Sequence, residues 1–488
     1  MKRTGIYFEV RENKREAYIQ AHENIWPEMR EVLNEAGIRN YSIWNLGRKL
    51  FAYYETDDEE RMQAVLDSSK VYADWRERME EFVYIEETAG RKEWPMELVF
   101  FNQGETDRRM EKVRAILEEG GLDAALIYYD ELNIANGWYV TGWCPQFEKG
   151  AVFLPAKGEA ILLGGPESEP FAKMSSAVRE TRNFTVFMVP DEEYPNASII
   201  DFEKLYEELN GKGISLKRIG VVGTTVIPHA VYTQFAEGFK GVELVDITDE
   251  YEALRSHKSE WELDNVRQAT ALSYQAYLEM KELVKPGTYE HEIAAAGEYV
   301  CRKNGANSFA YATIVGSGER SNAVVPTAIN KELKDGEWVM LGIAPRVNGY
   351  AGTFGETVPV SGTYTEEQKW AVNVLRKVLR ATKAMLKPGV SGKEIDVPGR
   401  EIFQEEGLLP YLVCPFAHTI GLMEAEAPFY GPNSEDVLEP GMTVCVDVSF
   451  FGHPTLHGAR IETVYTITED GCRPLCPELD AWFEEDVK

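Results

Sequence analysis

The sequence has few cysteines, no long apolar run and no excess of basic side chains. Its six cysteines do not suggest a disulfide scaffold in a chain of 488 residues. Cys472 and Cys476 have no second cysteine pair or nearby histidine that would complete a zinc site. No uninterrupted run of about 18 apolar residues occurs, so we expect no membrane span. The N-terminus does not resemble a signal peptide, and we expect a cytoplasmic protein with reduced thiols.

Positive charge is also scarce. The chain carries 51 Lys+Arg against 81 Asp+Glu, for a formal net charge of -30. The field of so acidic a protein repels phosphate, which excludes nucleic acid and anionic membranes as expected partners and leaves a small-molecule substrate. The stretches 164–169 and 222–226 are rich in glycine but lack the spacing of a nucleotide-binding loop. The length, about three times that of a typical domain, predicts two or three domains.

The first 103 residues alternate between strand and helix patterns. The helix pattern should break at Trp26-Pro27 and end at Gly37, because proline suits a first helical turn and glycine a C-terminal stop. The predicted order is β-α-β-β-α-β, that of a ferredoxin-like domain. The expected elements are a strand at 5–10, a helix at 14–36, strands at 40–45 and 50–55 around Gly47, a helix at 58–82 and a strand at 96–102.

Aromatic side chains and one histidine recur in this segment. Tyr18 and His22 are four residues apart and share a helix face, and Trp26 continues that stripe. Tyr41 and Trp75 add further rings. Ring faces that cover sugar C–H groups, hydroxyls that orient the sugar and an imidazole that moves protons would together form a sugar pocket. The alternative is a core helix whose histidine has only a structural hydrogen bond.

The strings AYIQAHENIWPE (17–28) and NYSI (40–43), with Trp75, closely resemble the L-rhamnose mutarotase family over about the first 100 residues. The resemblance implies that His22 donates the proton that opens and recloses the sugar ring. It also implies that Tyr18, Tyr41 and Trp75 hold the sugar, with Trp26 beside them. One departure is Arg76, where the family often has a second tryptophan, and it bears on which sugar is bound. Members are usually dimers.

The rest of the chain divides near residue 250. Strands alternate with helices over about 104–250, which favours an α/β domain. Residues 251–488 contain two similar helix entries, KPGTYEHEI (285–293) and KPGVSGKEI (387–395). This internal sequence similarity is compatible with a duplicated half-domain or with coincidence.

A second resemblance covers about residues 107–480. It rests on the strings NIANGWYVTG (133–142), LRSHKSEWELDNVRQA (254–269), HTIGL (418–422), LEPGMTVCVD (438–447) and GARIETVYTITEDG (458–471). They look like those of the creatinase/prolidase/aminopeptidase P family. The resemblance implies a small α/β domain followed by a pseudo-symmetric pita-bread catalytic domain. It also implies a homodimer in which the small domain of one subunit closes the site of the other.

The metal-dependent members of that family hold two divalent ions with two Asp, one His and two Glu. By resemblance, these positions fall on Gly342, Thr353, His418, Asp447 and Glu462. Glycine offers no ligand and threonine is a poor one for a hard cation. We therefore expect no cofactor, with a single ion on His418, Asp447 and Glu462 as the alternative.

The metal-free branch of the family fits no better in detail. The histidine of creatinase falls near Val324 or Val325, and the arginine that holds its substrate falls near Glu148, so creatine is an unlikely substrate. The remaining acidic and histidine side chains could catalyse acid/base hydrolysis without a metal if burial gives them different pKa values. The candidate members of this constellation are the catalytic residues His418, Glu356, Glu426, Asp447 and Glu462, with Glu424, Tyr350 and His457 as further neighbours or substrate contacts.

The sequence thus predicts an α+β protein with a ferredoxin-like α/β dimeric-barrel domain (1–103), a creatinase-type small α/β domain (104–250) and a pita-bread domain (251–488). Our main hypothesis is a bifunctional enzyme, in which a sugar mutarotase is fused to a metal-free or single-metal hydrolase of a sugar-derived compound. The alternatives are a mutarotase with a non-catalytic pita-bread module that binds or dimerises, and an Xaa-Pro metallopeptidase. A homodimer or larger homo-oligomer is expected in each case.

Overall fold

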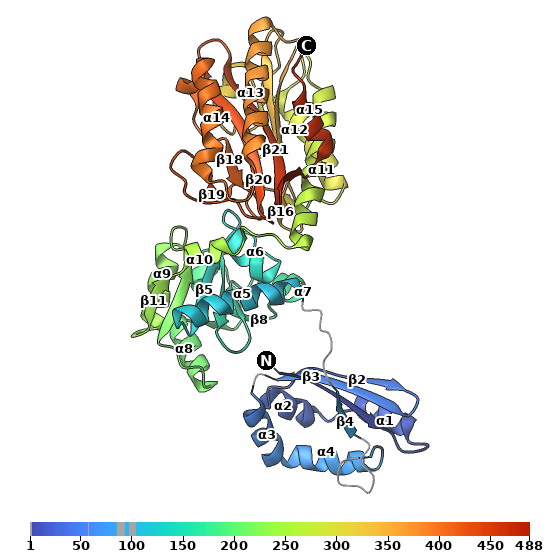
Figure 1. Cartoon of the computed structure of the whole chain (residues 1–488). Helices are drawn as coiled ribbons and strands as arrows, with labels where there is room; N and C mark the ends of the chain where they lie inside the picture. The colour runs from blue at the N-terminus through green and yellow to red at the C-terminus, as the bar shows by residue number, and fades with distance from the viewer. Residues whose placement is uncertain (1, 57, 85–92, 97–103) are drawn as a thin grey trace. The chain divides into compact units, whose positions relative to one another are not determined.

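The computed structural model describes residues 2–56, 58–84, 93–96 and 104–488, and this part of the chain forms two compact units, Met1–Gly104 and Glu105–Lys488 (Figure 1). No helix in these ranges is both long and apolar enough to cross a bilayer.

The first unit is a four-stranded antiparallel sheet in the order β2-β3-β1-β4, packed against helices. This is the strand order of a ferredoxin-like domain, so the predicted fold of the segment is confirmed. Its elements are β1 (Lys2–Glu9), α1 (Arg15–Glu23), α2 (Pro27–Glu35), β2 (Arg39–Leu46), β3 (Lys49–Thr56), α3 (Glu59–Ser68), α4 (Lys70–Glu80) and β4 (Glu93–Met96).

Local signals account for most of these boundaries. The break before Pro27 is confirmed, and Gly37 adopts a left-handed φ of 68° just after α2, as a C-terminal stop requires. The long helix predicted over 58–82 is instead two helices, because the Ser69 hydroxyl accepts the Tyr72 N–H and starts a new helix. β4 shares only Met96 with the final strand predicted over 96–102, and the rest of that prediction lies outside the described residues.

The second unit begins with a mixed seven-stranded sheet in the order β11-β10-β5-β6-β7-β8-β9. Strands β5 and β6 are buried along their whole length, since helices cover both faces of the sheet centre. The elements are α5 (Glu105–Gly120), β5 (Ala124–Tyr129), α6 (Ala135–Thr141), β6 (Gly150–Pro155), β7 (Ile161–Gly164), α7 (Glu169–Ser175), β8 (Glu180–Phe184), β9 (Ile199–Ile200), α8 (Phe202–Gly211), β10 (Arg218–Val222), α9 (His229–Gly238), β11 (Glu243–Asp246) and α10 (Thr248–Ala253).

The remainder of this unit contains an eight-stranded sheet in the order β13-β14-β17-β21-β20-β18-β19, with β22 beside β21, and a three-stranded sheet in the order β12-β15-β16. Helices α11 to α14 pack on one face of the eight-stranded sheet and bury a large apolar core (Figure 1). The elements are α11 (Glu260–Glu282), α12 (Glu290–Lys303), β12 (Ser308–Phe309), β13 (Ile314–Ser317), β14 (Trp338–Ile343), β15 (Pro345–Val347), β16 (Tyr350–Ala351), β17 (Phe354–Pro359), α13 (Glu366–Met385), α14 (Gly392–Glu405), β18 (Ala417–Thr419), β19 (Glu426–Phe429), β20 (Thr443–His453), β21 (His457–Thr468), β22 (Gly471–Pro474) and α15 (Pro477–Glu484).

The two KPG segments occupy equivalent places in this sheet-and-helix layer. One joins α11 to α12 and the other joins α13 to α14. Their glycines, Gly287 and Gly389, have φ angles of 90° and 84°, which a side chain would strain. In both, a glutamate of the first helical turn, Glu292 or Glu394, accepts the backbone N–H at the helix start. The similarity between the two segments therefore corresponds to a repeated helical hairpin.

Gly352, between β16 and β17, packs directly against the backbone of α11. A Cβ atom at this position would lie 2.0 Å from the backbone nitrogen of Thr270, in the middle of α11. We predict that Gly352→Ala lowers the free energy of unfolding by about 3 kcal/mol, because backbone cannot rotate away as a side chain can. Thermal and denaturant unfolding would measure this.

Gly211→Ala is the matched control, since nothing lies within 4 Å of a Cβ there. It should leave stability unchanged or slightly raised. Equal effects of the two substitutions would contradict the packing argument.

Candidate functional site

A polar cluster lies on the face of the eight-stranded sheet opposite helices α11 to α14. The antiparallel register pairs His418 of β18 with Cys445 of β20, and Asp447 of β20 with Glu462 of β21. Paired residues point to the same face, and so do residues two apart on one strand. Strand geometry alone therefore gathers side chains that are up to 44 positions apart in the sequence.

Glu424 joins this cluster from the turn between β18 and β19. Its Oε1 lies 3.7 Å from Nε2 of His418. The Cys445 thiol donates to Oε1 of Glu462 at 3.2 Å. One donor atom from each of His418, Glu424, Cys445 and Glu462 lies within 4.8 Å of the other three. We call these four residues the His–Cys–Glu cluster.

Burial of several acids together shifts their protonation. Burial raises the pKa of Glu462 well above its usual range, and the nearby Glu424 and Asp447 raise it further. Burial likewise raises the pKa of Glu424, although a hydrogen bond from Glu462 opposes this. The pKa of the Cys445 thiol is raised by burial and then by Glu462. Without a cation, the cluster therefore keeps protons that exposed carboxyl groups would lose.

Asp447 borders the cluster but is held by another residue. Its Oδ1 accepts a hydrogen bond from Nε of the buried Arg460 at 3.0 Å. The same guanidinium also donates to the backbone oxygen of Val324. Asp447 is therefore neutralised by Arg460, and it is not one of the four residues within mutual ligand distance.

The residues present do not fit the pair of ions that the family resemblance implies. A Cβ at Gly342, the first Asp position, would lie 3.3 Å from the Tyr311 hydroxyl. That hydroxyl is hydrogen-bonded at 3.0 Å to Oγ1 of Thr353, the second Asp position. Neutral hydroxyl groups thus occupy the place of two carboxylates. The remaining His–Cys–Glu cluster has donors suited to one divalent ion.

The structure does not bring Glu426 into the cluster. Its carboxylate accepts the Met423 N–H and lies 3.7 Å from Nζ of Lys258 and 3.8 Å from Nε of Arg255, with all three side chains buried. Because a buried carboxylate is costly without opposite charge, this arrangement gives Glu426 a structural role.

Glu356 is also absent from the cluster, because it projects from the opposite face of the sheet. Its neighbour Gly355 pairs with Glu462, so strand alternation turns Glu356 toward the helices. There Oε1 accepts hydrogen bonds from Arg376 at 3.1 Å and from Trp482 at 2.7 Å. Burial raises the pKa of Glu356 to about 7.

Two predicted substrate contacts also lie elsewhere. The buried Tyr350 hydroxyl donates to Glu262 at 2.5 Å and accepts from Arg109 at 2.8 Å. His457 lies at the β20–β21 hairpin end, where its Nδ1 is 3.5 Å from Asn322. Of the constellation expected from sequence, only His418, Glu424 and Glu462 therefore meet directly, with Asp447 at the edge.

The first unit does gather the aromatic residues that the sequence singled out. The rings of Tyr18 and His22 are 4.3 Å apart, His22 and Trp75 are 5.5 Å apart, and Trp26 and Trp75 are 5.1 Å apart. Tyr41 raises the pKa of the Tyr18 hydroxyl, after the larger effect of burial. Tyr18, Trp26 and Trp75 thus form one aromatic group with the His22 imidazole, while the Tyr41 ring packs against Tyr54.

A hydrogen bond orients that imidazole. Nδ1 of His22 lies 3.1 Å from the backbone oxygen of Tyr18, so Nδ1 is the protonated donor and Nε2 carries the free lone pair. Burial lowers the pKa of His22, against a smaller opposite effect of this hydrogen bond. The resting side chain is therefore a neutral base. The guanidinium of Arg78, which the sequence reading missed, lies 5.6 Å from the Trp26 ring centre and 5.9 Å from that of Trp75.

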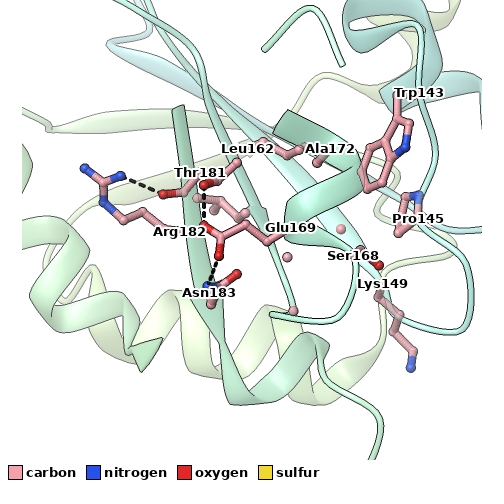
Figure 2. A pocket seen from close by; sticks show the side chains of 14 residues that line it. Trp143, Pro145, Lys149, Leu162, Ser168, Glu169, Ala172, Thr181, Arg182 and Asn183 are labelled. Carbon is pink, nitrogen blue, oxygen red and sulfur yellow. Dashed lines mark hydrogen bonds between the residues drawn. The ribbon is translucent and has the colours of Figure 1, made fainter. Parts of the chain in front are cut away.

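A small hollow between β7, β8 and α7 offers less chemistry. Figure 2 shows its acidic side chain, Glu169, bonded to Thr181 at 2.6 Å and to Asn183 at 3.0 Å. Trp143 and Pro145 close another side of it. Glu169 is also paired with Lys173 at 2.9 Å, so the one carboxylate among the described residues that line the hollow is fully engaged by neighbouring side chains.

Sequence reasoning missed Cys445, Tyr311 and Arg460. A signal existed for two of them, because Cys445 and Arg460 are each two residues from a predicted site residue on the same strand, and so share its face. Tyr311 had none, since its hydroxyl reaches the site from the irregular segment before β13.

Comparison with known families supports two separate origins for the chain. Residues 3–101 match the family model "L-rhamnose mutarotase". Residues 109–257 match "Creatinase/Prolidase N-terminal domain". Residues 264–469 match "Metallopeptidase family M24".

Individual relatives agree with the second and third matches. An Xaa-Pro dipeptidase of Pyrococcus furiosus is 27% identical over 368 residues, which cover 75% of this chain and 97% of that protein. The prolidase structure from Pyrococcus furiosus is 26% identical, with a TM-score of 0.62 over 74% of this chain and 98% of that one. An X-Pro aminopeptidase structure from Thermotoga maritima is 25% identical, with a TM-score of 0.66 over 75% and 96%.

These likenesses confirm the predicted fold and change the functional ranking. They favour the Xaa-Pro metallopeptidase alternative over a hydrolase of sugar-derived compounds. They do not support the expectation of a site without any cofactor, whereas the alternative of one divalent ion is compatible with them. The chain is a fusion of an L-rhamnose mutarotase-like domain with a creatinase/prolidase/aminopeptidase P-like pita-bread protein.

Proposed function

We propose that the second unit hydrolyses the amide bond of small Xaa-Pro-type substrates. The observation that carries this proposal is the His–Cys–Glu cluster, which lies on the sheet face not covered by α11 to α14 and is flanked by Asp447 and Arg460. The likeness to prolidases supports the substrate class. The buried acids and the imidazole support hydrolysis as the chemistry.

The roles follow from position. His418, Cys445 and Glu462 would hold one divalent ion, which would act as a Lewis acid on the amide carbonyl when bound. Glu424, on a turn at the edge of the cluster, would take a proton from the attacking water and pass it to the leaving nitrogen. Arg460 would hold the Asp447 side chain in place at the edge of the cluster.

We predict that Glu462→Gln lowers kcat/KM for Ala-Pro or Met-Pro dipeptides by about 100-fold or more, because a buried acid of the cluster is lost. Glu356→Gln is the matched control. It alters a buried glutamate on the other face of the same sheet, and should leave turnover per folded molecule near that of the wild type.

These activities are measured by amine release after loading with Zn²⁺, Co²⁺ or Mn²⁺. If the metal-loaded wild type cleaves no Xaa-Pro dipeptide, the proposed function is wrong. Equal losses in Glu356→Gln and Glu462→Gln would also contradict it.

We further propose that the first unit interconverts the anomers of an L-rhamnose-type sugar. The aromatic group around His22 supports this, because ring faces can cover the sugar and Tyr18 can orient a hydroxyl. Nε2 of the neutral His22 would accept the proton of the anomeric hydroxyl and pass it to the ring oxygen as the bond between that oxygen and the anomeric carbon breaks. The reverse transfers, from the freed hydroxyl through Nε2 to the carbonyl oxygen, would accompany reclosure. Trp26, Tyr41 and Trp75 would hold the sugar.

We predict that His22→Ala reduces catalysed anomer exchange of L-rhamnose by about 100-fold or more, measured by saturation-transfer NMR against the uncatalysed rate. Because burial lowers the pKa of His22, exchange should persist at pH 6.5 and fall only in more acidic solution, as the imidazole becomes protonated. Loss of activity on going above pH 6.5, or full exchange by His22→Ala, would refute the role of this histidine.

Assembly and compartment follow as further proposals. We infer domain boundaries near residues 103 and 250, a cytoplasmic location and a homodimer or larger homo-oligomer. Trp44 and Leu46 support self-association, because these side chains on β2, an edge strand in the described part of the first sheet, are 69% and 70% exposed. All six cysteines are free, which supports a reducing compartment.

A further inference from the structure

We propose that the second unit holds a single zinc-class ion through the Cys445 thiolate, His418 and Glu462, while Glu424 flanks the open side of that ion. This inference deepens the proposed hydrolase, on whose site it rests. The family positions would imply two ions that are bound by carboxylate oxygens and a histidine. The proposed site instead holds one ion and includes a sulfur ligand.

The orientation of His418 is the first supporting observation. Its Nδ1 lies 3.0 Å from the backbone oxygen of Thr419, so this nitrogen carries the proton and Nε2 presents its lone pair to the cluster. Metal-ligating histidines usually have this arrangement, in which a carbonyl fixes the tautomer and the ring plane.

Spacing is the second observation. The four donor atoms lie within 4.8 Å of one another; the Cys445–Glu462 pair is 3.2 Å apart and the His418–Glu424 pair is 3.7 Å apart. Zinc bonds of about 2.0–2.3 Å set tetrahedral ligand atoms about 3.3–3.8 Å apart, so small side-chain rotations reach that geometry. A donor set of one thiolate, one imidazole and a carboxylate favours Zn²⁺, Co²⁺ or Fe²⁺ over the harder Mg²⁺ or Ca²⁺.

Charge is the third observation. In the described part of the chain, neither Glu424 nor Glu462 has a lysine or arginine nitrogen within 4 Å, and the nearby Arg460 is engaged by Asp447. Two acids and a thiol packed without a cation are costly to bury, and one divalent ion offsets that cost. Tyr311 and Thr353 add no charge that could attract a second ion.

Position separates Glu424 from the three ligands. Glu424 lies on a turn and its side chain is 17% exposed, whereas His418, Cys445 and Glu462 lie on three neighbouring strands, and Cys445 and Glu462 are almost fully buried. Three protein ligands with one open position are typical of a catalytic zinc site, and a glutamate beside the open position can move a proton. The rigid strands therefore supply ligands, and the turn supplies the base.

The test is cobalt substitution in the full-length chain. After chelator dialysis, Co²⁺ titration should saturate at one ion per chain and produce a near-ultraviolet thiolate-to-cobalt charge-transfer band. Cys445→Ser should abolish that band and weaken binding at least tenfold. Cys301→Ser, which alters another buried cysteine, is the control and should keep the band.

Glu424→Gln tests the division of roles. It should keep the band and the stoichiometry but lose dipeptide hydrolysis by about 100-fold or more. Two ions per chain, no bound ion, a band that survives Cys445→Ser, or loss of the ion in Glu424→Gln would each overturn the proposed ligand set.

The outcomes also distinguish this inference from the proposed function. A band lost only in Cys445→Ser, together with no cleavage of any dipeptide, would refute the hydrolase and leave the ligand set standing. Dipeptide cleavage that is unaffected by Cys445→Ser, with no charge-transfer band, would refute the ligand set and leave the hydrolase standing.

Discussion

The antiparallel register of β18, β20 and β21 is the constraint on which the rest of the site depends. It pairs His418 with Cys445 and Asp447 with Glu462, and so places four reactive side chains on one face of a sheet whose other face is sealed by helices. A slip of one residue would turn each of them into the apolar core, where an ionised group is prohibitively costly. The large core beneath the sheet therefore both stabilises the fold and fixes which side chains can meet.

The substitutions in this site are mutually dependent. Loss of an acid at Gly342 leaves room for the Tyr311 hydroxyl, and that hydroxyl bonds to Thr353 in the place of the second lost acid. Asp447, at the edge of the cluster, is paired with Arg460. Gly342 and Thr353 carry no charge and Asp447 is paired, so the site has less uncompensated negative charge than two divalent ions would need.

Much of the fold could be predicted from sequence, because its signals are local. The break at Pro27, the stop at Gly37 and the two KPG hairpins each follow from backbone preferences of one or two residues. The site was less predictable. Glu356 and Glu426 have the right chemistry and lie near other site residues in the sequence, yet one faces the helices and the other pairs with Lys258. Strand alternation alone could have excluded Glu356 from the site. Lys258, the partner of Glu426, lies 168 positions away in the sequence, so no local pattern predicts the pair.

Buried ion pairs between side chains outside the cluster explain why the cluster can be rigid. Arg109 of α5 reaches Glu262 of α11 and the Tyr350 hydroxyl, and thereby ties the small α/β sheet to the helices behind the larger one. The Lys258–Glu426 pair fixes the segment that follows Glu424. Ion pairs of this kind add little net stability, but removing one partner strands a charge and is strongly unfavourable. These ion pairs therefore act mainly by excluding other conformations of the segments that they join. Glu424 lies on a turn, and it stays within reach of His418 only if that turn keeps one conformation.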